Sequence, residues 1–222
     1  MKSKTIIVAT ISAAAVGFTA NSCVALATST VGVAVIKQVL LGGISKGLGI
    51  FKNKDAFMQN NLIDKALPQQ LQDVNSLLNK ISPNLVTKEK EYIAQAAAYT
   101  VNISEPILNN AVNSLTTEDI SRIAQGGSGM ATQVLKEKTQ SQLVAAIAPK
   151  VDEKLNEFGI VKSINSALQG SNILGSLLGN GNNNSSSDIS NLAAQQLVNG
   201  LFNIVEDYEK QNSQKLLGAF GK

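Results

Sequence analysis

Histidine is absent from this chain of 222 residues, and cysteine occurs once, as Cys23. Without histidine there is no Ser-His-Asp triad, no Cys-His dyad and no histidine-ligated zinc, copper or iron site. A single cysteine forms neither an intrachain disulfide nor a thiolate metal cluster. We therefore expect no metal and no cofactor and assign no catalytic residue. The chemistries left are paired carboxylates, a Ser-Lys dyad or an oxygen-ligated cation.

Tryptophan is also absent, aromatic residues make up 4% of the chain, and Arg122 is the single arginine. Nucleic-acid binding calls for a dense basic stripe interleaved with aromatic side chains. The chain has 19 basic and 16 acidic residues, and without Lys2 and Lys4 the basic residues fall to 17. The net charge is then close to zero, so we expect no nucleic-acid partner.

The N-terminus has the layout of a bacterial export signal. Lys2 and Lys4 form a short positive segment, residues 5–18 are uncharged and mostly apolar, and the small or polar residues 20–22 precede Cys23. We interpret residues 1–22 as a signal peptide that is removed. The mature protein is then expected outside the cytoplasm.

Two cleavage modes fit this signal. Lipoprotein processing would leave Cys23 as the first residue, carrying lipid chains that hold the protein in a membrane. Ordinary cleavage after Ser22 or Ala27 would instead release a periplasmic or secreted protein. We favour the lipid anchor, on the periplasmic side or at the outer membrane, because a lone cysteine at the cleavage point needs a reason in an oxidising compartment. An uncleaved membrane helix is a poorer fit, since a span needs about 20 apolar residues.

The remaining chain predicts an all-α fold, a single compact domain of about eight helices. Residues 23–34 are expected to be a tether and residues 35–222 the helical domain, with a flexible Gly/Asn/Ser-rich insertion at about 170–187. Helical periodicity predicts helices over residues 31–41, 44–51, 67–81, from 83 onward, 107–115, 116–126, 130–148, 150–169 and 188–212.

Glycine and proline set several of these expected boundaries. Gly42 and Gly43 are expected to end or kink a helix, Pro106 to start a new one, and Pro149 to end one or begin the next. Thr116 and Asp119 lie in a stretch expected to cap the helix that follows. Gly200, inside the last helix, is expected to permit close helix packing.

Two helix faces were predicted from spacing. Tyr92, Ala96 and Tyr99 are expected to form one face of a helix. In the last helix an apolar stripe is expected to leave Glu206, Glu209 and Lys210 facing away from it. The residues of that stripe are Ala193, Leu197, Leu201, Ile204 and Tyr208.

The best candidate site is the glycine-rich loop 126–129. Glycines allow backbone N–H groups at a helix start to hold a small anion or a phosphorylated headgroup. The alternative is a purely structural role, in which Gly126 or Gly127 ends one helix and Ser128 caps the next. For Thr139 the structural alternative is a hydrogen bond from its hydroxyl group to the carbonyl group four residues earlier. The expected ligand contacts are Gly126, Gly127, Ser128, Thr132, Lys136 and Thr139.

Several blocks of the chain, in order over about residues 35–220, resemble the bacterial domain of unknown function family 4197. The resemblance implies an exported, all-helical domain and no established activity. The blocks that carry it are residues 43–57, 60–61, 66–71, 96–107, 115–119, 123–127, 131–132, 138–149 and 200–202, followed by Glu206 and Glu209.

These observations predict an envelope protein, more a binding or structural domain than an enzyme. Its partner is expected to be an envelope protein or a small ligand held in a helical groove. The alternative is a hydrolase-type enzyme that uses carboxylates or a Ser-Lys pair such as Ser141 with Lys138 or Ser45 with Lys46. A third reading is direct membrane remodelling by apolar helices such as residues 31–41. Oligomeric state is not indicated by the sequence.

Overall fold

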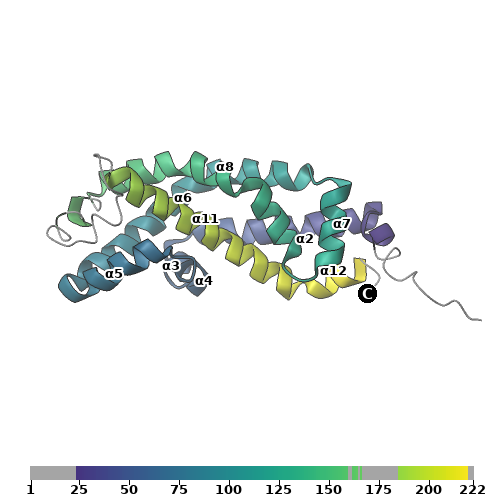
Figure 1. The fold of residues 1–222 in the computed structure, drawn as a ribbon, viewed down its shortest axis with the longest axis horizontal. Coiled ribbons are helices and arrows are strands. Elements are labelled where there is room, and N and C mark those ends of the chain that lie inside the picture. The colour runs from purple at the N-terminus through teal and green to yellow at the C-terminus, as the bar shows by residue number, and fades with distance from the viewer. Residues whose placement is uncertain (1–23, 160–161, 165, 167–184, 220–222) are drawn as a thin grey trace, which may run out of the picture.

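The computed structural model describes residues 24–159, 162–164, 166 and 185–219. The predicted signal peptide, Cys23 and most of the low-complexity segment lie outside these residues. All regular structure in the described part is α-helical, as predicted (Figure 1). The helices are α2 (Thr30–Lys52), α3 (Lys54–Met58), α4 (Asn61–Asp64), α5 (Gln69–Ile81), α6 (Pro83–Asn113), α7 (Thr117–Gly126), α8 (Met130–Glu157), α11 (Ser185–Gln211) and α12 (Ser213–Ala219). This part alone delimits nine helices, more than the roughly eight expected.

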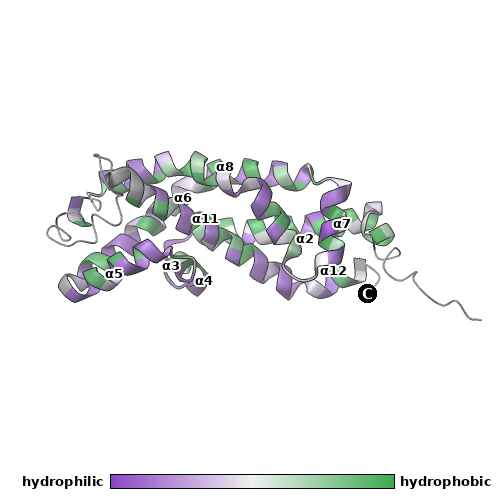
Figure 2. Cartoon of the chain, viewed as in Figure 1, coloured by the Kyte–Doolittle hydropathy of each residue, from purple (hydrophilic) through white to green (hydrophobic). Residues whose placement is uncertain are grey.

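The four long helices α2, α6, α8 and α11 form an elongated bundle. Helix α11 packs against both α8 and α2, and α6 packs against both α8 and α2. The short helices α3 and α4 lie with α5 at one end, and α7 and α12 lie at the other (Figure 1). Each long helix carries hydrophobic residues together with hydrophilic ones (Figure 2). The buried residues join into one continuous core.

Helix α2 packs one face against α6 and α11. Ser29 caps its start by accepting a hydrogen bond from the Gly32 N–H group at 3.2 Å. Since α2 begins at Thr30, it includes the last residues of the expected tether. The predicted break at Gly42 and Gly43 is wrong, because α2 continues through both. A Cβ atom at Gly43 would lie 3.1 Å from Val205 Cγ1, so this glycine brings α2 close to α11.

One helix of the described residues, α2, is long and apolar enough to cross a membrane. Its side chains Ile36, Leu40 and Ile44 are buried in the protein core. Core packing accounts for the apolar residues on this face, whereas Val31 is 72% exposed and Leu41 is 36% exposed on the outer side of α2. Membrane remodelling by this helix stays a prediction.

Both prolines that were expected to separate helices lie inside them. Pro106 is within α6 and Pro149 is within α8. Each proline removes the hydrogen bond to the carbonyl group four residues earlier. Those residues, Asn102 and Ala145, are exposed, as are the two prolines. The helices continue because each defect lies on a solvent-facing side, where water can bond the freed carbonyl oxygen.

The predicted faces of α6 and α11 need correction. Tyr99 is 51% exposed and lies off the buried face of α6, whereas Ala96 of the predicted face is buried, together with Ile93 and Thr100. In α11 the predicted apolar stripe lies against the core, but Glu209 does not face away from it, because its side chain is only 1% exposed. A buried carboxylate at the end of the core requires hydrogen-bond partners.

Gly200 provides a test of close packing between α11 and α4. A Cβ atom at Gly200 would lie 3.2 Å from both Cα and Cγ1 of Ile63. We expect Gly200→Leu to lower the free energy of unfolding by about 1–3 kcal/mol, because the added side chain must displace α4. Chemical denaturation followed by circular dichroism measures this change. The control is Gly49→Leu on α2, where a Cβ atom would meet no atom within 4 Å. Equal stability of both variants would count against the packing role.

Candidate functional site

The loop predicted as a site connects α7 to α8. The capping box at the start of α7 is present, with the Thr116 N–H group donating to Asp119 Oδ2 at 2.8 Å. Helix α7 ends at Gly126, and Gly127 follows with a φ of 78°. Gly129, with a φ of 89°, is the N-cap residue of α8. The alternative expectation that Ser128 caps α8 is therefore wrong.

The cap of α8 comes from a different helix. The carboxylate of Glu209, on α11, accepts hydrogen bonds from the N–H groups of Gly129 at 2.9 Å, Ala131 at 3.1 Å and Thr132 at 2.7 Å. It also accepts one from the Thr132 hydroxyl group at 2.6 Å. A negative charge at a helix N-terminus is favoured by the helix dipole and by the unpaired N–H groups there. The anion at this helix start is thus the Glu209 side chain.

The structure brings together some of the predicted contact residues. Gly126, Ser128, Thr132 and Lys136 line a cavity of about 320 Å³ beside α11. The carboxylate of Glu206 borders the same cavity. Contact of these residues with an external ligand stays a prediction, but an anion there would meet the Glu206 carboxylate, and the Thr132 N–H and hydroxyl groups already donate to Glu209.

The other two predicted contacts, Gly127 and Thr139, do not line this cavity. Thr139 is buried, and its hydroxyl group donates to the Leu135 carbonyl group at 2.7 Å. This is the back-bonding of an ordinary helical threonine.

The lysines of the two candidate Ser-Lys pairs are engaged by carboxylates. Lys138 contacts Asp119 Oδ2 at 2.8 Å, and Lys46 contacts Asp207 Oδ2 at 3.5 Å. Burial favours a higher pKa for Asp119, but hydrogen bonds from Lys138 and Thr116 hold the pKa of this carboxyl group below its usual value. A lysine that acts as a general base must be neutral and in contact with its serine, and no hydrogen bond between these lysines and Ser45 or Ser141 is present among the described residues.

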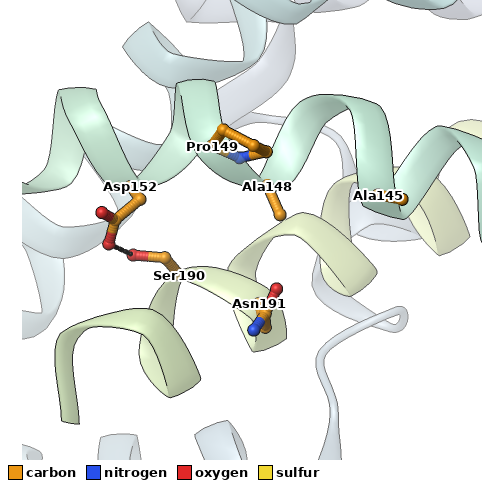
Figure 3. A pocket seen from close by; sticks show the side chains of 6 residues that line it. All are labelled: Ala145, Ala148, Pro149, Asp152, Ser190 and Asn191. Carbon is orange, nitrogen blue, oxygen red and sulfur yellow. Dashed lines mark hydrogen bonds between the residues drawn. The ribbon is translucent and has the colours of Figure 1, made fainter. Parts of the chain in front are cut away.

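A second cavity, of about 280 Å³, lies between α8 and α11 (Figure 3). Ser190 and Asp152 face each other across it, and the Ser190 hydroxyl group donates to Asp152 Oδ1 at 2.7 Å. The rest of its lining is Ala145, Ala148, Pro149 and Asn191. Because the serine and the carboxylate satisfy each other, this contact is explained as a link between the two helices.

A third cavity, of about 240 Å³, has a different character. It lies where α3, α4, α5, α6 and α11 meet, at the α5 end of the bundle in Figure 1. Its lining combines buried apolar side chains with carboxyl and amide groups. The lining residues are Phe57, Asp64, Leu67, Asn75, Asn79, Val86, Glu89, Lys90, Ile93 and Gln196.

Three buried oxygen atoms of this lining have no hydrogen-bond partner among the described residues. They are Asn75 Oδ1 on α5, Glu89 Oε2 on α6 and Gln196 Oε1 on α11. Each unpaired buried group costs about 1–3 kcal/mol. Folded proteins contain few such atoms, and three in one cavity indicate a site that a ligand can complete.

Glu89 is the only charged member of this trio. It is 3% exposed, and burial raises its pKa to about 7 from an ordinary 4.5. The other charged residues of the lining form an ion pair, with Lys90 Nζ 2.7 Å from Asp64 Oδ1. The cavity therefore contains a desolvated carboxyl group that changes its charge near neutral pH.

The sequence analysis did not single out Glu89, because the predicted face of this helix was followed only from Tyr92 onward. Glu89 lies three residues after Val86 and four before Ile93, which is the spacing of one helix face. Glu89 also lies three residues before Tyr92 and seven before Ala96, so it extends the predicted face of Tyr92, Ala96 and Tyr99 by one turn. A carboxylate spaced with the apolar residues was the available signal.

The fold and site define an all-helical bundle with a largely apolar cavity that also has carboxyl and amide groups in its lining. Residues 26–217 match the family described as Protein of unknown function (DUF4197), and the chain belongs to this family. No curated protein and no solved structure gives a significant match.

Proposed function

We propose that this protein is a non-catalytic binding protein of the bacterial envelope, which holds a small ligand in the cavity around Glu89. The observation that carries the proposal is the set of three unpartnered oxygen atoms in one cavity. A ligand that bonds them would relieve the cost of their burial. The cavity also has an apolar wall, which supplies binding energy by burying ligand surface.

Methyl NMR titration with a chemically mixed set of small molecules tests this proposal. Ile93 and Val86 line the cavity, so a ligand bound there should shift their methyl signals. Ile123 on α7, at the opposite end of the bundle in Figure 1, is the reference whose methyl signals should stay unchanged. If no compound shifts the cavity methyl signals selectively, the proposed function fails for this site.

Export and lipid anchoring form the second part of the proposal. They are supported by the charge pattern of residues 1–22 and by the position of Cys23 directly after them. We expect radiolabelled fatty acid to be incorporated into the wild type in a bacterial host and to be lost in Cys23→Ala. The Cys23→Ala protein should also leave the membrane fraction. Unlabelled wild-type protein in the soluble envelope fraction would favour ordinary cleavage.

A hydrolase-type enzyme is the second candidate, and one observation favours it. Asp64 and Glu89 line the same cavity, and a carboxyl group with a pKa of about 7 suits general acid–base catalysis at neutral pH. Asp64 is engaged in the ion pair with Lys90. Ligand turnover that Glu89→Gln abolishes would support the enzyme, whereas binding without turnover would support the binding protein.

A further inference from the structure

We infer that the ligand of the Glu89 cavity is a small organic cation, with a primary ammonium group on a short apolar chain. This inference rests on the binding function proposed above and specifies its ligand class. The argument uses the hydrogen-bonding character, the charge and the apolar lining of the cavity in turn.

The unpartnered atoms require hydrogen-bond donors. Asn75 Oδ1, Glu89 Oε2 and Gln196 Oε1 are all acceptors. An amide can turn to present its NH₂ group, but an ionised carboxylate has only acceptor oxygens, so Glu89 sets the requirement. A primary ammonium group has three N–H donors and no acceptor, which matches three acceptors on three helices.

The charge of the cavity also favours a cation. Lys90 and Asp64 neutralise each other at 2.7 Å, and the Asp64 side chain is 49% exposed, so this pair is in contact with solvent. Glu89 is 3% exposed, and an ionised carboxylate in such surroundings needs a positive partner. A carboxylate or phosphate ligand would add a second negative charge to the buried one.

The apolar lining indicates the rest of the ligand. Phe57, Leu67, Val86 and Ile93 form much of the wall. They suit a hydrocarbon chain, whereas a divalent metal ion requires several charged oxygen ligands. No cluster of three or more metal-binding side chains occurs in the searched, described part of the chain. An alkylammonium ion therefore fits the lining better than a hydrated inorganic ion.

Isothermal titration calorimetry with four matched compounds tests the ligand class. They are n-butylammonium chloride, 1-butanol, sodium butyrate and tetramethylammonium chloride, with potassium chloride as the salt control. We expect saturable binding of n-butylammonium alone, because butanol and butyrate lack the positive charge and tetramethylammonium lacks N–H donors. Equal binding of butanol or butyrate would overturn the cation inference while leaving the binding function intact. Equal binding of tetramethylammonium or potassium would overturn the ammonium assignment.

Two charge-removing variants assign the binding to Glu89. We expect Glu89→Gln to weaken n-butylammonium binding about thirtyfold or more, because the ligand loses its buried counter-charge. The matched control is Glu91→Gln on the same helix, since Glu91 pairs with Lys54 at 3.6 Å and does not line the cavity. Equal loss of binding in both variants would overturn the assignment.

Binding to the wild type should also depend on pH. The ligand stays protonated well above neutral pH, as lysine does. Glu89 ionises near neutral pH, while Asp64 and Lys90, the other charged groups facing the cavity, remain paired. Affinity for n-butylammonium should therefore rise between about pH 6 and pH 8 and then level off. A pH-independent affinity would contradict contact with Glu89, and this readout does not depend on the folding of any variant. If none of these compounds bound, and none of the small molecules in the methyl NMR titration bound either, the proposed binding function would be wrong as well.

Discussion

Replacing Glu209 with alanine is expected to lower the free energy of unfolding by about 3–5 kcal/mol. The change removes the acceptor for three backbone N–H groups and one hydroxyl group at the start of α8. Ala131 and Thr132 are buried, so water cannot readily replace the lost partner. Each buried donor left unpaired costs about 1–3 kcal/mol, and the favourable charge at the helix dipole is also lost.

Urea denaturation followed by circular dichroism measures this loss, and Glu206→Ala is the matched control. Glu206 is one turn earlier on α11, has a side chain 40% exposed and pairs with Lys210. An exposed pair of this kind contributes about 0–1 kcal/mol. Glu209→Gln keeps one acceptor oxygen without the charge, so its loss should be intermediate. If Glu209→Ala and Glu206→Ala were equally stable, the proposed role of Glu209 in fixing α8 to α11 would be wrong.

Local signals in the sequence predicted the elements that depend on local chemistry. A capped helix start was predicted over residues 116–119, and the structure has a capping box there between Thr116 and Asp119, which lie within one turn. Helix α5 was predicted because Leu71, Val74 and Leu78 repeat at helical spacing, and all three are buried. These features need no knowledge of what packs against them.

Features that depend on a distant partner were missed. Glu209 and Gly129 are 80 residues apart, and no local pattern connects a carboxylate in one helix to the start of another. Gly43 is expected from the sequence to end or kink a helix because it is a glycine, whereas its close approach to Val205 on α11 is set by the fold. The Glu89 cavity likewise forms only where α5, α6 and α11 meet. Its three unpartnered oxygen atoms are therefore buried together only in the folded protein.

Stability should fall as the pH rises toward neutrality, because of Glu89. Burial raises the pKa of this group from 4.5 to about 7 in the folded protein. Between these two pH values the unfolded chain has released the Glu89 proton, while the folded chain still holds it. The unfolded state then binds fewer protons than the folded state, so raising the pH favours unfolding. Above about pH 7 Glu89 is ionised in both states, and its contribution no longer changes.

Glu89→Gln should remove this component of the pH dependence. One pKa unit corresponds to about 1.4 kcal/mol. The free energy of unfolding of the variant should therefore exceed that of the wild type by about 3 kcal/mol at pH 8 and be nearly equal to it at about pH 4. Other groups, including Asp119, titrate in both proteins and cancel in the difference. Glu91→Gln, the surface control, should keep the wild-type pH dependence. Denaturation curves of the three proteins across this pH range give the measurement.

Adding n-butylammonium at pH 8 connects this stability effect to the proposed ligand. The ionised Glu89 carboxylate destabilises the empty protein because its charge is buried with an unpartnered oxygen. A bound cation supplies the missing charge and donors and binds only the folded state, so it should raise wild-type stability as its concentration rises. The same concentration of n-butylammonium should raise the stability of Glu89→Gln much less. If Glu89→Gln were no more stable than the wild type at pH 8, Glu89 would not be a buried charge, and the electrostatic basis for a cationic ligand would be lost.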